Sequence, residues 1–534
     1  MANHAKYSII IFGLVAVIGF ALFYKLGAVP LADPDEPRYA EAAREMIERG
    51  SYLVPYFNYE LRLQKPVLHY LLICASYKLL DVSEFSARLP SVLAALALLV
   101  AAFFFMQRFC GITAAALSCL IMGSSPLYFV PARMTMPDMV FSFFIIASLF
   151  CFYLGWQAVA SGAKKWWYAG FYFFQVIAAW TKGPVGILVP VAVALFSLWQ
   201  QRDLRELKSL RPGRCLVLVL LASLPWYLYI YFFVDKETMT ELSRRETAGR
   251  IFGLFGRKYD PLYYYFIVLF AGLVPWVFLL PWALYQRFQK LASSRLRSFL
   301  EIWFLVVFLF FTVCATKKAH YVVMLSCVCA AWFGTVMSDV LRDFPGKRDT
   351  GLVLSFFACL AVLIVGAFKG LSWLSKNQPD LIVGGMAAMF TLIVPALAAL
   401  WLAARGHTRS ACIALSFVTF LTLIPGLGYG TAWVEKNRSV KAFLKENEAV
   451  IAQARELYTG VKIFNSLPFY LRRQVIMDTD EEKLVRKLQG PEPCIVFTTD
   501  KRYNYHKELF APYLTAANYK KVLLSNFAAQ GVVP

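Results

Sequence analysis

The sequence predicts an all-α polytopic membrane protein that carries a small C-terminal α/β domain. Of its 534 residues, 59% are apolar and 16% are charged, whereas a globular domain has about 45–50% apolar and about 25% charged residues. Apolar runs of 18 or more residues recur from Tyr7 to Gly430, and the composition becomes polar from about Thr431. Most of the chain is therefore expected to face lipid, and only its last part to face water.

Each apolar run is long enough to cross the hydrocarbon core of a bilayer, roughly 30 Å thick, as a helix. A helix is required because backbone groups in lipid need hydrogen-bond partners within their own segment. The first run is expected to be a retained anchor, since no small-residue cleavage site follows it. We expect 13 spans, near residues 8–27, 89–108, 111–130, 138–158, 166–181, 184–200, 215–234, 262–285, 299–316, 321–341, 351–369, 381–402 and 410–430.

The charge distribution predicts the orientation of these spans. A net charge of +21 would indicate a nucleic-acid partner in a soluble protein, but here alternate connectors hold 17 basic residues against four acidic ones. By the positive-inside rule these connectors are cytoplasmic, so the N-terminus is cytoplasmic and the C-terminus external. We expect a transmembrane domain over 1–430, which includes the external loop 28–88, and an external domain over 431–534.

Two helices are expected in the external loop 28–88. Residues 35–50 have the pattern of a helix, because Asp35 can cap it, Pro37 suits its first turn and Gly50 can end it. Residues 67–80 are apolar but too few for a span. Both helices are therefore expected to lie along the membrane surface.

The polar tail has the pattern of a small α/β domain. We expect a helix over 439–454, a strand over 461–464, a charged helix over 480–487 and a strand over 494–498. Ten of the eleven cysteines of the chain lie in or beside apolar runs, without the spacing of a metal site. We therefore expect neither a disulfide framework nor a structural zinc.

Polar side chains gather on the predicted external side. The set contains four acids, six cations and two ring side chains: Asp33, Asp35, Glu36 and Asp138; Lys65, Lys182, Arg244, Arg245, Lys317 and Lys318; His320 and Tyr321. Charged groups at membrane depth are costly and usually line a functional cavity. Lys and Arg can hold a phosphate as it leaves, and a carboxylate can act as a base toward a hydroxyl. The set predicts a site for an anionic substrate with a lipid tail, such as a polyprenyl phosphate.

Each member of this set also has a simpler structural interpretation. Asp35 and Asp138 could cap helices, and any single lysine could extend its charge from the interface into water. The pair Arg244 and Arg245 could lie on a solvated loop, while His320 could belong to an aromatic belt. Their coincidence on one face, against the positive-inside trend, favours a shared site.

Five segments resemble the lipid A aminoarabinose transferases. They are DEPRYAE at 35–41, QKPV at 64–67, MPD at 136–138, TKGP at 181–184 and FNSLPFY at 464–470. Those enzymes are polyprenyl-phosphate-dependent members of the GT-C glycosyltransferase superfamily. The resemblance implies a membrane enzyme of 13 helices with a periplasmic tail domain, which moves a sugar from undecaprenyl phosphate without a nucleotide sugar.

The resemblance also implies roles for single residues. Asp35 matches the catalytic acid of the first periplasmic loop, and Tyr39 matches the tyrosine one turn later. Lys65 matches the lysine that holds the donor phosphate, while Asp138 and Lys182 match further residues of the cavity.

The resemblance also bears on Arg244, Arg245 and Tyr321, and the sequence differs from the family pattern at Gln64. Arg245 matches the phosphate-contacting arginine of a later loop, and Tyr321 matches a further cavity residue; Arg244, beside Arg245, is a further candidate for substrate binding. Gln64 departs from the pattern, because family members often have Glu there. A charge that could tune Lys65, or hold a metal or an amino sugar, is therefore absent.

The implied function is inverting transfer of 4-amino-4-deoxy-L-arabinose, or a related sugar, to lipid A or lipopolysaccharide. The implied location is the periplasmic face of a bacterial inner membrane, and the partners are the undecaprenyl-phosphate-linked donor, the acceptor and membrane lipids, without nucleic acid. No cofactor or metal site is expected, with a divalent cation left open. Transfer to core, O-antigen or protein is an alternative within enzymes. A flippase, whose sites usually lie near the midplane of repeated folds, and a lipid receptor are alternatives outside them.

Overall fold

The structure is a computed structural model, and its elements divide into two compact units. It describes residues 2–237, 240, 260–280, 295–343, 350–377, 382–407, 410–411, 414, 439–461, 464–518 and 521–527. The helical unit comprises Met1–Tyr24, Leu63–His69 and Pro90–Leu427, and the loop–tail unit comprises Lys25–Arg62, Tyr70–Leu89 and Gly428–Pro534. The predicted architecture, mostly helical with a small C-terminal sheet domain, is confirmed.

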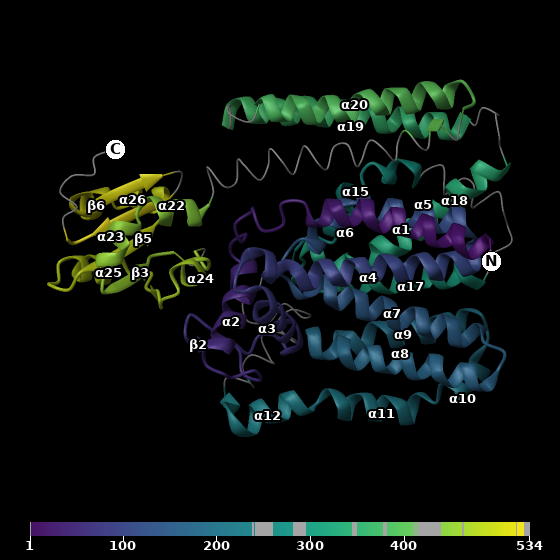
Figure 1. The fold of residues 1–534 in the computed structure, drawn as a ribbon, viewed down its shortest axis with the longest axis horizontal. Coiled ribbons are helices and arrows are strands. Elements are labelled where there is room, and N and C mark those ends of the chain that lie inside the picture. The colour runs from purple at the N-terminus through teal and green to yellow at the C-terminus, as the bar shows by residue number, and fades with distance from the viewer. Residues whose placement is uncertain are drawn as a thin grey trace. The chain divides into compact units, whose positions relative to one another are not determined.

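The helical unit is built mainly of helices (Figure 1). They are α1 (Ala2–Phe23), α4 (Glu84–Cys110, which begins in the loop–tail unit), α5 (Ile112–Ser124), α6 (Pro126–Ala132), α7 (Pro137–Gln157), α8 (Ser161–Lys182), α9 (Val185–Gln200), η1 (Leu204–Glu206), α10 (Leu207–Leu210), α11 (Pro212–Ser223), α12 (Pro225–Phe233), α15 (Tyr264–Gly272), η3 (Trp276–Leu279), α17 (Arg295–Val313), η4 (Ala319–Val322), α18 (Met324–Asp343), α19 (Thr350–Asn377) and α20 (Ile382–Ala404).

Several of these helices have the length and composition of membrane spans. Among the described residues, three qualify alone: Glu84–Cys110, Pro137–Gln157 and Arg295–Val313. The pair α5 and α6 is bent by 62° and the pair α11 and α12 by 41°, and counting each pair as one span raises the number to five. Both second helices begin with a proline, which lacks the N–H needed to continue the first helix. The number of 13 spans stays a prediction.

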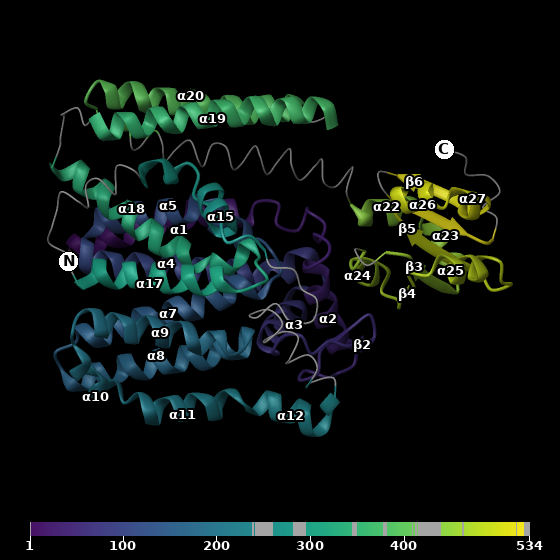
Figure 2. The ribbon, with the colours of Figure 1, turned by 180° about the vertical axis from the view of Figure 1, so that it is seen from behind.

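Helices α7, α8 and α9 lie side by side in the helical unit (Figures 1 and 2). Gly186 allows α9 to approach α8 closely, since a Cβ at this position would stand 2.7 Å from the backbone of Ala178. Gly183, with φ of 89°, ends α8 directly after Lys182. This turn fixes Lys182 at the end of its helix, on the connector to α9.

The loop of the loop–tail unit contains α2 (Glu36–Glu48), the hairpin β1 (Tyr56–Phe57) and β2 (Glu60–Leu61), and α3 (Leu68–Leu80). Both predicted helices are therefore present, with Gly50 at φ of 65° just beyond α2. The side chains of α3 hold it to α2: Tyr77 donates to the carbonyl of Ala40 at 3.2 Å, and Cys74 to that of Ala43 at 3.3 Å.

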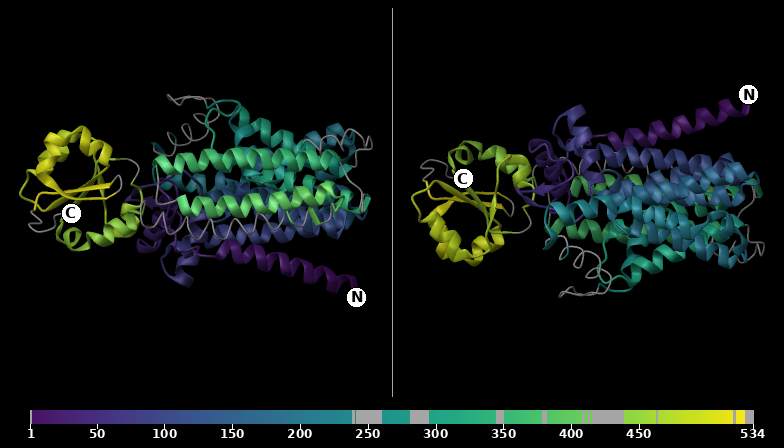
Figure 3. Two further views of the ribbon diagram at one scale, coloured as in Figure 1. Left: turned by 90° about the horizontal axis from the view of Figure 1, so that it is seen from above. Right: turned by 90° about the horizontal axis from the view of Figure 1, so that it is seen from below.

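The tail forms a five-stranded sheet with helices on both faces (Figure 3). The strand order is β4-β3-β5-β7-β6, with β4, β3 and β5 parallel and β7 and β6 antiparallel. Its elements are α22 (Val440–Glu446), α23 (Glu448–Gln453), β3 (Glu456–Thr459), α24 (Leu467–Leu471), β4 (Ile476–Met477), α25 (Glu481–Leu488), β5 (Cys494–Thr498), α26 (Asp500–Tyr505), α27 (Lys507–Phe510), η6 (Ala511–Tyr513), β6 (Leu514–Asn518) and β7 (Lys521–Ser525).

Alternating side chains of the sheet separate the tail core into two layers. Ile495 and Phe497 of β5 pack with α22 and α23, while Cys494 and Val496 pack with α25 and α26. The strand predicted over 461–464 was wrong at its described ends, because the sheet takes Glu456–Thr459 instead, in parallel register with β5. The predicted helix over 439–454 is present as two helices that meet at Asn447.

Candidate active site

A polar cluster in the helical unit surrounds Asp138. This residue lies in the first turn of α7 and is 2% exposed. Its Oδ1 pairs with Nζ of Lys182, and its Oδ2 lies 3.7 Å from Nε2 of His320. Lys65 and the buried His69 also act on this carboxylate electrostatically. Five residues from four separate segments of the chain thus collect at the start of α7.

Tyr321 forms one side of this cluster. Its ring is 8% exposed, and the ammonium of Lys182 lies 4.2 Å from the ring centroid, within range of a cation–π interaction. The rings of His320 and Tyr321 meet edge to face at 5.2 Å. The short helix η4 therefore brings both residues toward Lys182 and Asp138.

These contacts decide between some of the interpretations left open by the sequence. Asp138 is not the cap of α7, because Met136 holds that position and the Asp138 carboxylate is used by Lys182 and His320. His320 contacts a buried acid, which differs from the expected aromatic belt. His69, which is 1% exposed, was not among the predicted site residues, although it lies two residues after the QKPV segment at 64–67.

The three acids before and within the start of α2 have different partners. The carboxylate of Glu36 is 2% exposed and pairs with Arg88 at 2.8 Å. Asp33 bonds to the tail, as described below. Asp35 holds the cap position of α2 without a capping hydrogen bond from its side chain; its carboxylate is 29% exposed and lies 3.7 Å from Arg38. The cap interpretation of Asp35 is therefore not supported by its geometry.

Tyr39 lies one turn after Asp35 and is 8% exposed. Its ring packs on Tyr70 at 5.6 Å, and the guanidinium of Arg62 lies 5.3 Å from its centroid. Burial and the nearby charge of Arg62 lower the pKa of Arg38. The guanidinium groups of Arg38 and Arg62 thus lie near each other, and Arg38 lies beside Asp35, an arrangement that suits an anionic ligand.

Lys317 of the predicted set, and Arg133 outside it, have structural partners. Arg133 donates to the carbonyls of Ala21 and Leu22, at the end of α1. Lys317 donates to the carbonyls of Asp260 and Cys314. These two cations therefore stabilise chain ends and connectors.

The predictions on Arg244 and Arg245, and those on cofactors and metals, are not tested by the structure. Arg244 and Arg245 lie outside the described residues. Within the part of the chain that is described, no three His, Cys, Asp or Glu side chains come together as metal ligands. The expectations on cofactors and metals stay predictions.

Asp33 joins the loop to the tail. Its carboxylate accepts hydrogen bonds from the backbone N–H of Ser466 at 2.9 Å and from the Ser466 hydroxyl at 2.5 Å. Burial raises the pKa of Asp33 to about 7, and the hydrogen bonds from Ser466 and Asn465 and the charge of Arg38 act in the opposite direction. The ammonium of Lys521 also acts on Asp33 electrostatically.

This shift predicts a pH dependence of stability. Because the folded state binds the Asp33 proton more tightly than the unfolded chain, its contribution to stability is greatest below about pH 4 and declines until about pH 7. In Asp33→Asn, which keeps an acceptor for Ser466, most of that decline should disappear. Thermal unfolding in detergent between pH 5 and 8 measures it, with the exposed Asp81→Asn as matched control; an unchanged pH slope in Asp33→Asn contradicts the prediction.

The chain is similar to known proteins over most of its length. Residues 8–237 match the model of the dolichyl-phosphate-mannose-protein mannosyltransferase family. An uncharacterised protein of Aquifex aeolicus is 27% identical over 505 residues, covering 93% of this chain and 95% of its own. The undecaprenyl phosphate-alpha-4-amino-4-deoxy-L-arabinose arabinosyl transferase of Yersinia pestis is 27% identical over 492 residues, covering 86% of this chain and 84% of its own.

Two crystal structures share the fold along nearly the whole chain. ArnT from Cupriavidus metallidurans bound to undecaprenyl phosphate has a TM-score of 0.79 at 21% identity, covering 97% of this chain and 98% of its own. The apo state of the same protein has a TM-score of 0.75 at 21% identity and covers 99% of both chains. The resemblance found in the sequence is therefore confirmed: the chain is similar in sequence to an aminoarabinose transferase and shares the fold of ArnT.

Proposed function

We propose that this protein transfers a sugar from undecaprenyl phosphate to lipid A or lipopolysaccharide at the periplasmic face of a bacterial inner membrane. The sugar is 4-amino-4-deoxy-L-arabinose or a close relative. The observation that carries the proposal is the cluster of Lys182, His320 and Lys65 around the buried Asp138, in a chain similar to transferases of this kind. In this proposal the transmembrane domain over 1–430 has 13 spans, the N-terminus is cytoplasmic and the domain over 431–534 is periplasmic.

The proposed reaction is a single displacement with inversion. The bond between the anomeric carbon and the phosphate oxygen breaks, and its electron pair leaves with undecaprenyl phosphate. Lys65, Lys182 and Arg245 neutralise this leaving group, which lowers the barrier because the charge develops in the transition state. The acceptor oxygen forms the new bond on the opposite face of the sugar.

The carboxylates have separate tasks in this mechanism. Asp35 takes the proton of a hydroxyl acceptor. A phosphate acceptor is already nucleophilic, and Asp35 then orients it or stabilises the positive charge that builds on the sugar. Asp138 holds Lys182 in place, and Tyr39, Tyr321 and Arg244 contact the substrates.

Because of Gln64, a donor sugar without an amino group is an alternative to aminoarabinose. This exposed residue precedes Lys65 and brings no charge that could pair with an amino sugar. Mass spectrometry of lipid A from cells with and without the protein identifies the sugar and its acceptor. Aminoarabinose on lipid A only in cells with the protein supports the proposal, whereas a sugar on protein or O-antigen with lipid A unchanged contradicts it.

Replacing Lys65 by Met should weaken the binding of undecaprenyl phosphate by about 10-fold or more, because a hydrogen bond to a charged group contributes about 1.5–3 kcal/mol. The change keeps the length of the side chain and removes its charge. Titration of the purified protein with undecaprenyl phosphate measures the dissociation constant. The exposed Lys483→Met is the matched control, and equal affinities of the two variants would remove Lys65 from the donor site.

A further inference from the structure

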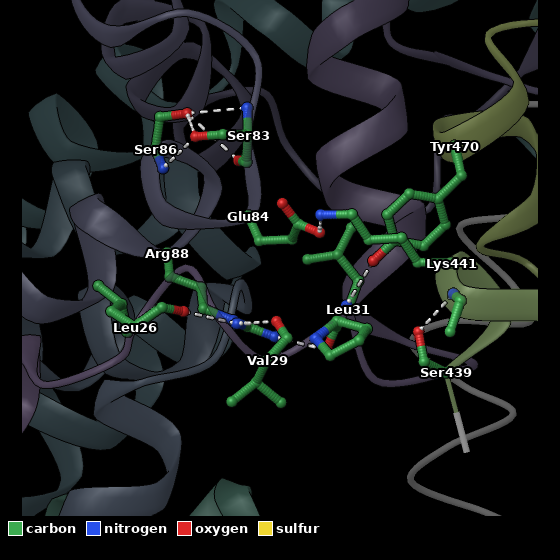
Figure 4. Close-up of polar contacts among 12 residues, drawn as sticks. Leu26, Val29, Leu31, Ser83, Glu84, Ser86, Arg88, Ser439, Lys441 and Tyr470 are labelled. Carbon is green, nitrogen blue, oxygen red and sulfur yellow. Dashed lines mark hydrogen bonds and ion pairs between the residues drawn. The ribbon is translucent and has the colours of Figure 1, made fainter. Parts of the chain in front are cut away.

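The tail holds the loop just before Asp35 through three of its residues. Ser466 donates two hydrogen bonds to Asp33, at 2.9 and 2.5 Å, and Asn465 donates to the carbonyl of Pro34 at 3.2 Å. The hydroxyl of Tyr470 accepts from the N–H of Leu31 at 2.9 Å (Figure 4). We call these contacts the clasp. It binds the chain at three of the four positions that precede Asp35.

The donors of the clasp are buried. Asn465 is 3% exposed and Ser466 is 1% exposed, so water does not compete freely for these bonds. Two outer contacts support the same docking. Asn58 exchanges two hydrogen bonds of 2.8 Å with the backbone of Val475, and Lys441 pairs with Glu84 at 2.7 Å (Figure 4).

The Ser466 side chain bonds to the loop and does not cap its own helix. It stands at the cap position of α24, where a serine usually accepts a hydrogen bond from the helix backbone. No such capping bond is present, and the hydroxyl donates to Asp33 instead. The polar side chains of the 464–470 motif therefore form hydrogen bonds with the segment before Asp35.

Arg88 holds the same segment through other atoms. Its guanidinium donates to the carbonyls of Leu26, Val29 and Pro30, at 2.8, 2.6 and 3.0 Å (Figure 4), and to the carboxylate of Glu36. The backbone on both sides of Asp35 is thus fixed by buried groups, while the Asp35 carboxylate itself is 29% exposed.

We propose that the tail positions Asp35 for the transfer step. Its positioning residues are Asn465, Ser466 and Tyr470, which hold segment 31–34. Holding this segment fixes the orientation in which Asp35 meets the acceptor. The inference rests on the proposed function. It gives the C-terminal domain a task in the transfer step that does not require the domain to touch the substrate. A displacement of about 1 Å in a catalytic group can cost about 100-fold in rate, so losing part of the clasp should lower turnover without weakening donor binding.

The experiment compares Ser466→Ala/Tyr470→Phe with the wild-type chain in detergent. For each protein, titration with undecaprenyl phosphate counts the binding-competent molecules, and release of undecaprenyl phosphate from the sugar-loaded donor gives turnover per competent molecule. Tyr505→Phe, at a tyrosine that is 84% exposed, is the matched control. Dividing by competent molecules separates loss of fold from loss of positioning.

The expected result is a turnover per competent molecule about 10–100-fold below wild type, with the donor dissociation constant unchanged and Tyr505→Phe within about 2-fold of wild type. Unchanged turnover per competent molecule in Ser466→Ala/Tyr470→Phe, or an equal loss in Tyr505→Phe, overturns the inference alone. A wild-type chain that binds the donor and releases no undecaprenyl phosphate with any acceptor overturns the proposed function and the inference with it.

Discussion

Replacing Asp35 by Asn should lower the rate of sugar transfer by about 100-fold or more, while binding of undecaprenyl phosphate stays close to that of the wild-type protein. Asn keeps the size of the side chain and removes its charge and its ability to accept a proton. The Asp35 carboxylate is 29% exposed, with the guanidinium of Arg38 3.7 Å away, whereas Glu36 pairs with the buried Arg88 and Asp33 accepts from Ser466. It is therefore the member of the group best placed to meet a substrate.

The measurement is the initial rate of product formation by purified protein at saturating donor. Asp81→Asn is the matched control, since Asp81 is exposed and lies in the same loop; its rate should equal that of the wild type. Full turnover by Asp35→Asn would show that another group activates or orients the acceptor.

The second large effect is expected on stability, from Arg88→Met. The Arg88 and Glu36 side chains are 4% and 2% exposed, and removing one partner of a buried ion pair costs about 3–5 kcal/mol because the other charge is left without compensation. Three backbone carbonyls would lose their donor in the same change. Thermal unfolding in detergent should show a clear fall in midpoint.

Two further variants make this test specific. Arg486→Met removes an exposed ion pair with Glu482, at 72% and 80% exposure, and should change the midpoint little, because exposed pairs contribute little. Arg88→Met combined with Glu36→Leu should be less destabilised than the sum of the single changes. A midpoint for Arg88→Met equal to that of Arg486→Met contradicts the assignment of Arg88 as the support of the loop.

Much of the helical architecture could be predicted because its cause is local. The apolar runs predicted helices where α4, α7 and α9 lie. The order of Asp35, Pro37 and Gly50 predicted α2. The strand at 494–498 was evident from its apolar run. The strand at 456–459 was missed, because its pairing with β5 depends on register within the sheet and not on its own composition.

The roles of single charged residues were harder to predict. The sequence alone does not distinguish the roles of Asp33, Asp35 and Glu36. The structure does, because Asp33 bonds to Ser466 and Glu36 pairs with Arg88. The same holds for His320, whose contact with Asp138 joins η4 to α7. Such contacts link segments far apart in the chain, so no local pattern contains them.

The most direct test of the central claim supplies the purified protein with undecaprenyl phosphate carrying aminoarabinose and with lipid A in mixed micelles. Both products are followed by mass spectrometry. The account predicts release of one undecaprenyl phosphate for each sugar that appears on lipid A, with inverted configuration at the anomeric carbon. Modified lipid A without release of undecaprenyl phosphate, or retained configuration, would contradict it.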